Sequence, residues 1–316
     1  MNIIFMGTPS IAVPSLEALA HSGHNVIAVI TQPDQKSGRG MNMSFSPVKH
    51  SAMSLGIECL QPEKISDSSF LDMLEEKHAD LFCVAAYAQK LPDRLLEMTR
   101  YGCINMHPSL LPAYRGSGPL RGPILNGDAE SGVTIMQVNS QWDAGDILLQ
   151  ESFELDPEET SQTLEEKCAV LGARLMIEAA DALQAGTITP IPQDHEKATY
   201  LKQIRKEDGI IDFSKDAVFI ERQIRACIPW PSAYTYLNGK MFKIWKARTD
   251  EALKAPDAKP GMVVYADRKK ILIKTGAGCL EPVQVQLEGK KRMDAEDFLR
   301  GARIETGTVF GNGSGK

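Results

Sequence analysis

The sequence lacks the features that mark membrane, secreted and metal-binding proteins. No apolar run approaches the about 20 residues that a membrane span needs. The start, MNIIFMGTPS, has neither the basic residues nor the long apolar stretch of a secretory signal. We therefore expect no membrane partner. The 6 cysteines stand singly, without a Cys-x-x-Cys pair, which indicates reduced thiols in a cytoplasmic protein. The 6 histidines form no cluster with cysteines or carboxylates at metal-ligand spacing, so we expect no metal.

Several common catalytic motifs are also missing. The sequence contains no Gly-x-Ser-x-Gly elbow, no His-Glu-x-x-His pair, no P-loop and no Gly-x-Gly-x-x-Gly after its first apolar run. These absences argue against a serine nucleophile, zinc-dependent hydrolysis and dinucleotide binding.

The chain is long enough for two domains, and its charge is unevenly distributed between them. It has 316 residues, of which 43% are hydrophobic and 24% charged, as is ordinary for a globular protein. Residues 1–199 carry 13 Lys and Arg against 26 Asp and Glu, a net charge of −13, whereas residues 200–316 carry 22 against 15, a net charge of +7. A basic second part suits a polyanionic partner, because neutralised phosphates release counterions. The alternative is an ordinary solvated surface.

Apolar runs alternate with helical patterns in the first part of the chain. Residues 80–87 form a continuous apolar run, typical of a strand that is covered on both faces. Residues 160–185 carry apolar side chains at steps of three or four and end at a glycine, which predicts a long helix. The alternation predicts an α/β domain over residues 1–189, with an open, mostly parallel, Rossmann-like sheet. Further strands are expected at 2–7, 26–31, 102–107, 133–138 and 147–150.

The pattern changes near residue 190. Residues 190–206 start with two prolines and many polar residues and predict a linker. Asn238-Gly239 stands between two apolar runs, which is the strongest short signal of a hairpin. Together with three more short strands it predicts a small closed β-barrel of the oligonucleotide-binding (OB-like) type over 207–310. We expect residues 311–316 to be a flexible tail.

Asn105 and His107 lie two residues apart at the end of an expected strand. A period of two places both on one face of the sheet, at the carboxyl end where open α/β sheets bind ligands. An amide that donates to a developing oxyanion, beside an imidazole that moves a proton, suits acyl transfer. Asp143, after the next strand, can orient that imidazole. Each residue also has a structural interpretation as a loop tie, a satisfied buried histidine or a turn residue.

The motif around these residues resembles a known family. The order Asn105-x-His107-x-Ser-Leu-Leu-Pro, followed by Asp143-x-Gly145, is similar to the signature of the 10-formyltetrahydrofolate-dependent formyltransferases. Other short motifs resemble the branch of that family that acts on initiator tRNA, so that the likeness covers essentially the whole chain. They stand at residues 6–9, 31–34, 38–40, 46–49, 86–87, 128–134, 210–213, 224–226 and 229–231.

The resemblance implies a reaction and roles for individual residues. The formyl group of 10-formyltetrahydrofolate, the co-substrate, moves to the α-amine of methionyl-initiator tRNA. Asn105 and His107 are expected to stabilise the oxyanion, and Asp143 to hold His107 and help to carry the proton. No metal takes part. The residues expected to bind or shape the folate site are Ser109, Leu110, Leu111, Pro112, Tyr87 and Gln89.

The resemblance also implies contacts with tRNA. Arg39 stands in a long segment rich in proline, glycine and serine, and we expect it to enter the end of the acceptor stem. Phosphate contacts from the basic second domain position the tRNA without reading its sequence. We expect the protein to act as a monomer. The other candidate contacts are Lys36, Lys49, Lys202, Lys206 and Lys243, although a single lysine is more often a solvated charge.

Three other functions remain open at this point. The same core can formylate a small amine, such as a sugar nucleotide or glycinamide ribonucleotide. A transferase core without activity can serve as a tRNA-binding protein, and the intact Asn105, His107 and Asp143 argue against this. A folate hydrolase that releases formate shares the three residues but does not need a basic second domain.

The expected role of Arg39 can be tested directly. Arg39→Ala should weaken formyl transfer to tRNA, because a contact at the acceptor end is lost, and should leave the affinity for the formyl donor unchanged. Steady-state kinetics with each substrate varied in turn measures both effects. A parallel loss of affinity for the folate would contradict the assignment.

Overall fold

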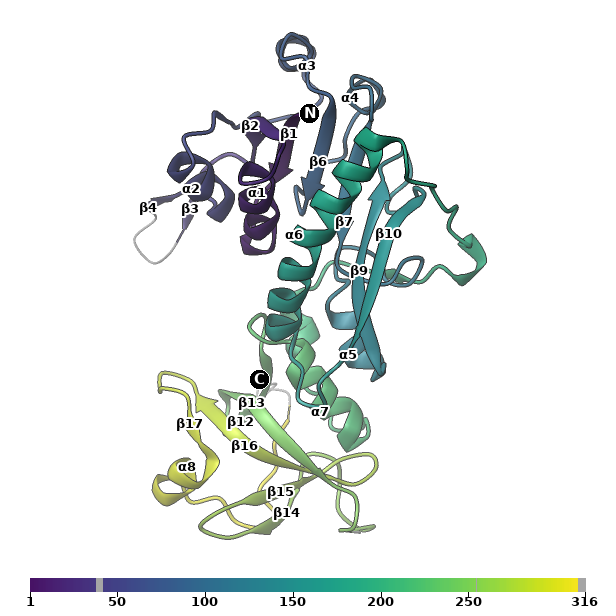
Figure 1. The fold of residues 1–316 in the computed structure, drawn as a ribbon. Helices are drawn as coiled ribbons and strands as arrows, with labels where there is room; N and C mark the ends of the chain where they lie inside the picture. The colour runs from purple at the N-terminus through teal and green to yellow at the C-terminus, as the bar shows by residue number, and fades with distance from the viewer. Residues whose placement is uncertain (38–41, 254, 312–316) are drawn as a thin grey trace. The chain divides into compact units, whose positions relative to one another are not determined.

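Figure 1 shows the fold in a computed structural model, which describes residues 1–37, 42–253 and 255–311. The chain forms two compact units. Unit 1 comprises Met1–Pro119, Glu130–Glu154 and Leu164–Lys202, and unit 2 comprises Leu120–Ala129, Leu155–Thr163 and Gln203–Lys316. Unit 2 therefore takes two short segments, 120–129 and 155–163, from the range 1–189 that the sequence pattern assigned to the first domain. Within the described ranges, no helix is both long and apolar enough to cross a membrane.

Unit 1 is built on a seven-stranded sheet with the order β10-β9-β7-β6-β1-β2-β5. The five strands from β7 to β5 are parallel, and β9 and β10 add an antiparallel edge beside β7. This mostly parallel α/β sheet confirms the expected fold class. The strands span Asn2–Gly7 (β1), Asn25–Ile30 (β2), Cys59–Leu60 (β5), Leu81–Ala85 (β6), Cys103–His107 (β7), Glu130–Gln137 (β9) and Ile147–Glu154 (β10).

Apolar side chains explain why the central strands lie inside. Every residue of β6 is buried, as expected for a strand with helices on both faces. The long helix α6, Ser161–Ala185, lies along the sheet (Figure 1) and turns a stripe of buried residues toward it. The close approach of α6 requires Gly172, because a Cβ there would lie 2.7 Å from Met106 of β7. The other helices of unit 1 are η1 (Ser10–Ala12), α1 (Val13–Ala20), α2 (Pro47–Ser54), α3 (Ser68–Glu75), α4 (Asp93–Leu96) and η2 (His195–Lys197).

Two small sheets complete unit 1. Strands β3 (Gln35–Ser37) and β4 (Asn42–Ser44) are antiparallel partners. Strand β8, Arg115–Gly116, pairs in parallel with β11, Tyr200–Leu201. Residues up to Lys202 therefore pack with unit 1, although the sequence predicts a linker over 190–206. The local composition could not predict the pairing of β11, because its partner strand lies about 85 residues earlier in the chain.

Unit 2 contains an antiparallel sheet with the order β12-β13-β16-β15-β14, and β17 pairs with β16. The hairpin expected at Asn238-Gly239 is present, with both residues at positive φ (51° and 76°), as a tight two-residue turn requires. The strands span Ala233–Leu237 (β12), Lys240–Asp250 (β13), Val263–Ala266 (β14), Ile271–Lys274 (β15), Cys279–Leu287 (β16) and Met293–Asp294 (β17). The helices are α5 (Arg121–Asn126), η3 (Lys206–Gly209), α7 (Ala217–Ala226) and α8 (Ala295–Gly301).

The chain near residue 310 closes this sheet into a ring. Gly311 exchanges backbone hydrogen bonds with Tyr236 of β12, and Phe310 donates one to Gly261 before β14. Val309 forms a bridge with Met262. The same short segment therefore joins the two edge strands, as a barrel requires. Gly311, expected to begin the flexible tail, is paired, and residues 312–316 lie outside the described residues.

Phe310 also anchors the interior of unit 2. Its ring is 1% exposed and lies 5.2 Å from the ring of Phe242, which in turn lies 5.3 Å from Phe298 (centroid distances). Aromatic rings in such tilted contacts bury large apolar areas.

Replacing Phe310 by alanine is expected to lower the free energy of unfolding by about 3–5 kcal/mol, because it leaves a cavity in the barrel core. Urea denaturation measures the change. Val309→Ala is the matched control. The side chain of Val309, next to Phe310 in the chain, is 55% exposed, so its loss should lower the free energy of unfolding by less than about 0.5 kcal/mol. Equal losses from the two variants would contradict this account.

Candidate active site

Asn105 and His107 point away from helix α6. They alternate along β7 with Met106, whose side chain packs against Gly172 of α6. Since successive side chains on a strand point to opposite faces, Asn105 and His107 share the other face of the sheet. They lie at the carboxyl end of the parallel strands, where open α/β sheets place their ligands.

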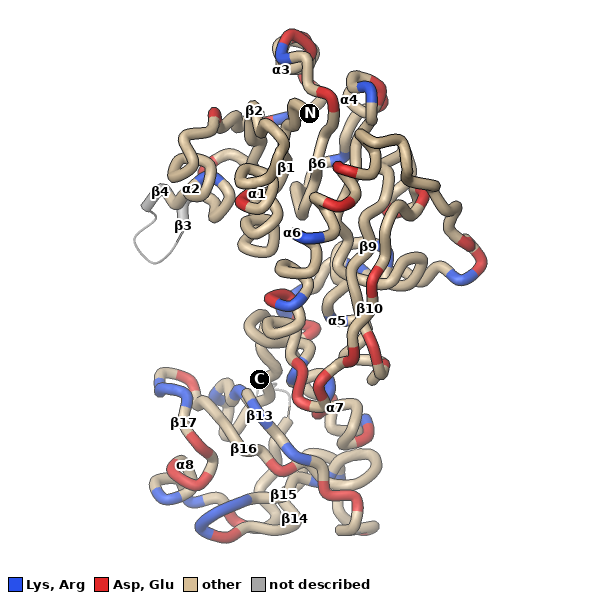
Figure 2. Tube along the Cα trace, in the orientation of Figure 1, with Lys and Arg blue, Asp and Glu red and all other residues tan. Residues whose placement is uncertain are grey.

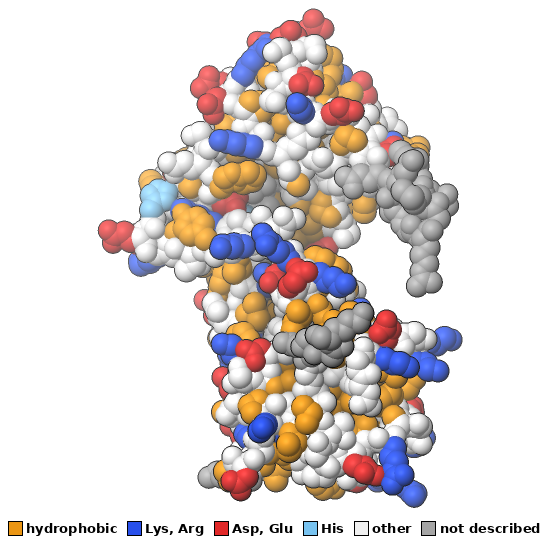
Figure 3. All heavy atoms as spheres, turned by 180° about the vertical axis from the view of Figure 1, so that it is seen from behind, with side chains coloured by type: hydrophobic (Ala, Val, Ile, Leu, Met, Phe, Trp, Pro, Cys, Tyr) orange, Lys and Arg blue, Asp and Glu red, His pale blue; other side chains and the backbone are white. Residues whose placement is uncertain are grey.

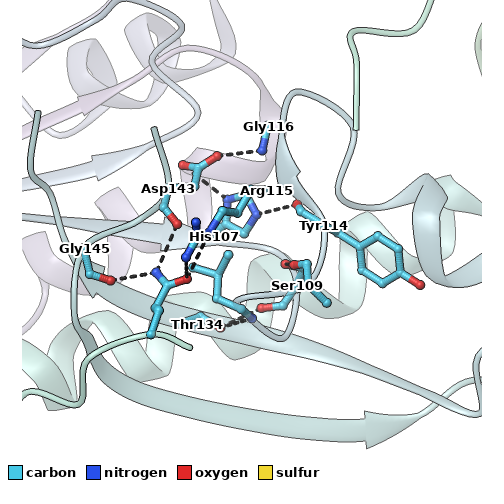
Figure 4. Close-up of polar contacts among 11 residues, drawn as sticks. His107, Ser109, Tyr114, Arg115, Gly116, Thr134, Asp143 and Gly145 are labelled. Carbon is cyan, nitrogen blue, oxygen red and sulfur yellow. Dashed lines mark hydrogen bonds and ion pairs between the residues drawn. The ribbon is translucent and has the colours of Figure 1, made fainter. Parts of the chain in front are cut away.

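One hydrogen bond of His107 determines which ring nitrogen carries the proton in the neutral form. Its Nε2 lies 3.0 Å from the carbonyl oxygen of Tyr114, and a carbonyl can only accept, so Nε2 carries the proton and donates it (Figure 4). The other ring nitrogen, Nδ1, lies 3.8 Å from Oδ1 of Asp143. That distance is too long for a hydrogen bond. The neutral ring therefore turns an unprotonated nitrogen toward the carboxylate.

The surroundings of His107 keep the ring neutral. Burial lowers the pKa of His107 below its usual 6.5, the Asp143 carboxylate and the Tyr114 carbonyl oppose that change, and the Arg115 guanidinium adds to it. The side chain is 4% exposed, so water does little to restore the charged form.

Asp143 is held in place by its loop. The loop joins β9 to β10, and Asp143 has a φ of +50°, in the left-handed region that aspartate tolerates better than most residues. Its Oδ2 accepts a hydrogen bond of 2.8 Å from the backbone N–H of Gly116. A Cβ on Gly145 would lie 1.7 Å from the carbonyl oxygen of Gln137, so only glycine fits two residues after the aspartate.

Left-handed backbone conformations gather around the site. Besides Asp143, Tyr114 has a φ of +61°, and Ala86 and Ala88 after β6 have values of +50° and +67°. Such conformations cost of order 1–3 kcal/mol each in non-glycine residues and are concentrated at functional sites.

Polar groups of the loop after β7 and of the neighbouring strand β9 hold the loop in shape. The Ser109 hydroxyl is fully buried and donates to the carbonyl oxygen of Ala113, while the Thr134 hydroxyl donates to the carbonyl oxygen of Ser109. The backbone N–H of Leu111 donates back to Thr134. Ser109 therefore shapes the loop without exposing its hydroxyl to a ligand. Leu110 and Pro112 are half-buried, and Leu111 is buried.

Tyr87 and Gln89 follow β6, the strand next to β7. Tyr87 is 2% exposed, and its buried hydroxyl has no hydrogen-bond partner among the described residues. Burial raises the pKa of Tyr87 to about 12, so the hydroxyl stays protonated. Gln89 accepts a hydrogen bond from the N–H of Ile65 and lies beside Gln32, which donates to the carbonyl oxygen of Tyr87.

The candidate tRNA contacts have very different surroundings. Arg39 lies outside the described residues, and Lys36 belongs to β3. Lys49 is 15% exposed and forms an ion pair of 2.5 Å with Asp34, so its charge is already neutralised. Lys243 lies 5.5 Å over the ring of Trp245.

The remaining candidates, Lys202 and Lys206, are exposed. Basic residues of unit 2 follow β13 and the turns near β14 and β17 (Figure 2). Seen from behind, the surface carries basic and acidic side chains side by side (Figure 3). No group of three His, Cys, Asp or Glu residues that could hold a metal occurs in the parts of the chain that the structure describes.

Sequence reasoning missed two residues that hold the site together. Arg115 is 2% exposed, and its guanidinium donates to Oε1 of Gln193 through Nε (3.1 Å) and Nη2 (2.6 Å). The amide of Gln193 donates in turn to the carbonyl oxygens of Asp143 and Gly145. Arg115 stands three residues after the motif that begins at Asn105 and ends at Pro112, and its local sequence gives no sign of burial. Gln193 stands in the stretch expected to be a linker, and no local pattern marks it.

The comparison with known proteins gives the class to which this site belongs. The family described as Formyl transferase matches residues 1–180, and Formyl transferase, C-terminal domain, matches residues 203–303. The chain therefore belongs to the formyl transferase family.

Its relatives within that family carry a more particular name. Methionyl-tRNA formyltransferase from Lachnospira eligens is 45% identical over 314 residues, covering 98% of this chain and 100% of the relative. The protein of the same name from Agathobacter rectalis is 45% identical over 310 residues, covering 98% and 99%.

A solved structure of the family supports the fold. The N-formyltransferase from Helicobacter canadensis, in complex with folinic acid and dTDP-3-aminofucose, has a TM-score of 0.65 and 21% identity, covering 92% of this chain and 99% of that chain. The likeness shows a shared formyltransferase fold.

The electrostatic balance at His107 predicts a response to mutation. Asp143→Asn should lower the pKa of His107 further, because it removes a negative charge that favours the imidazolium. Titration of the histidine signals by NMR measures this. Asp72→Asn removes an exposed carboxylate on α3 and should leave the titration of His107 unchanged. A rise in the pKa on Asp143→Asn would contradict the described geometry.

Proposed function

We propose that this chain transfers the formyl group of 10-formyltetrahydrofolate to the α-amino group of methionyl-initiator tRNA, which gives the formylmethionyl-tRNA used in translation initiation. Identity of 45% to methionyl-tRNA formyltransferases along almost the whole chain supports both substrates. The observation that carries the chemistry is the neutral imidazole of His107, which faces the Asp143 carboxylate at 3.8 Å on the same strand face as Asn105.

The oxyanion is the first charge that the site must stabilise. The amine nitrogen attacks the formyl carbon, the oxygen of that carbon becomes an oxyanion, and the bond to N10 of the folate then breaks. Asn105 is half-buried, and its side chain makes no hydrogen bond to the residues that the structure describes. Its amide N–H groups are therefore free to donate to the oxyanion, an interaction that strengthens as charge develops.

The proton lost by the amine is the second requirement. Nδ1 of His107 has a free lone pair in the neutral form, so it can take this proton and form the imidazolium. The imidazolium then faces a carboxylate that stabilises its charge. Transfer of the same proton to N10 releases tetrahydrofolate, so that the ring and the carboxylate return to their starting states.

The folate is proposed to lie against the loops after β6 and β7. Leu110 and Pro112 offer apolar surface in a loop that Ser109 and Leu111 hold in shape. Tyr87 and Gln89 come from the neighbouring strand end. Tyr87 remains a candidate by its place after β6, although its buried hydroxyl, which has no partner among the described residues, is not exposed to a ligand.

The tRNA is proposed to use separate surfaces. Lys202, Lys206 and Lys243 remain candidates for phosphate contacts, supported by the excess of basic residues after residue 200. The ion pair of Lys49 with Asp34 favours a structural role for that lysine. We also propose a monomer that acts in the cytoplasm, with a catalytic domain made mainly of residues within 1–189 and a tRNA-binding domain made mainly of 207–310.

Removal of the reacting side chains should abolish most of the activity. We expect His107→Ala to lower transfer to methionyl-initiator tRNA by about 10²–10⁴-fold, as for loss of an acid–base group. Asn105→Ala should lower it by about 10²–10³-fold, as for loss of an oxyanion donor. Incorporation of labelled formyl groups into tRNA measures both.

Two controls make this test specific. His21→Ala changes an exposed histidine at the end of α1 and should retain full activity. Methionyl-elongator tRNA should be a poor acceptor. Full activity of His107→Ala would overturn the site, and transfer to a small amine but not to tRNA would overturn the proposed acceptor.

A further inference from the structure

A buried arginine lies beside the catalytic pair without an acidic partner. Arg115 is among the largest fully buried side chains, and its guanidinium bonds only to neutral groups among the described residues: the Gln193 amide, Nδ1 of His195 and the Tyr200 hydroxyl. Burial of a cation is costly unless its surroundings compensate it. A packing role alone does not call for such a group.

The guanidinium determines which way the Gln193 amide faces. A guanidinium has only donors, so the amide must turn its oxygen toward Arg115 and its NH2 group the other way. That NH2 group lies 3.0 Å from the carbonyl oxygen of Asp143 and 2.6 Å from that of Gly145. The amide is 5% exposed and uses both of its donor hydrogens on the loop that carries the catalytic carboxylate.

The loop needs such a restraint. Asp143 has a φ of +50°, a conformation that persists only where the surroundings impose it. Its side chain is held from one side by the N–H of Gly116, and its backbone is held from the other by Gln193. Together these contacts set the distance between Asp143 and His107.

We propose that Arg115 and Gln193 are positioning residues for formyl transfer: the buried guanidinium orients the Gln193 amide, which tethers the loop of Asp143 beside His107. The reaction named here rests on the proposed function, whereas the tether itself does not. Neither residue touches the reacting atoms, so their loss should reduce the rate of the chemical step and not substrate binding.

Gln193→Glu separates this role from simple support of a buried charge. A glutamate keeps the shape of glutamine and gives Arg115 a counter-ion, but it has no N–H to donate to Asp143 and Gly145. Gln193→Met removes both interactions. If Gln193 only compensates the guanidinium, the glutamate variant should be as active as the wild type. If it tethers the loop, both variants should be impaired.

The experiment compares kcat and KM of the full-length variants with 10-formyltetrahydrofolate and methionyl-initiator tRNA. We expect kcat to fall by about 10- to 100-fold in both variants with KM for both substrates unchanged, because a misplacement of about 1 Å has effects of this size. Amide hydrogen exchange, followed by mass spectrometry, should be faster in residues 139–146 of both variants. Arg174→Met, which alters an exposed arginine paired with Glu151 and Glu178, is the control and should change neither quantity.

Unchanged exchange in residues 139–146, or a wild-type kcat in the glutamate variant, would overturn the proposal. Absence of transfer by the wild-type protein would instead overturn the proposed function, and the exchange measurement would still decide whether the tether exists.

Discussion

The site depends on backbone contacts from one three-residue segment, 114–116. The carbonyl oxygen of Tyr114 fixes the proton of His107, and the N–H of Gly116 holds the carboxylate of Asp143. Both contacts require the segment to approach closely, and Gly116 allows it: a Cβ there would lie 2.5 Å from the carbonyl oxygen of Leu201, and its φ of +98° favours glycine. The pairing of β8 with β11 fixes the segment. Residues 200 and 201 therefore support a site that is built around residue 107.

Opposing influences act on the protonation of His107 beside Asp143, and together they lower its pKa. Burial and the guanidinium of Arg115 favour a neutral His107, whereas Asp143 favours the imidazolium. A ring that is neutral at rest and stabilised when it gains a proton matches the needs of a group that takes a proton and returns it within one turnover. The separation of 3.8 Å between Nδ1 and Oδ1 is too long for a hydrogen bond, so the Nδ1 lone pair of the neutral ring stays available for that proton.

Local patterns in the sequence predicted the parts of the fold that local forces determine. The apolar run at 80–87, the helix over 160–185 and the turn at Asn238-Gly239 carry their periodicity or turn chemistry in adjacent residues. The spacing of Asn105 and His107 placed them on one face in the same way. The role of Gln193, the two segments before residue 164 that belong to unit 2, and the closure of the barrel by Gly311 depend on distant partners. Such pairings leave no periodic signal, so composition suggested a linker and a tail.

The lysines show why a net charge does not identify a binding surface. Lys49 sits in a motif of the expected tRNA-binding segment, yet its ammonium group is bound by Asp34 and Gln61, and its side chain is largely buried. A pair of this kind adds little to the attraction of phosphates, because its field is that of a dipole and not of a free charge. Asp34 and Gln61 are also hydrogen-bonded to each other. This contact joins the start of the segment that contains Arg39 to the residue after β5. The excess of basic residues after residue 200 therefore indicates only that a positive potential could attract a polyanion. Burial and ion pairing determine which of these side chains contribute to that potential.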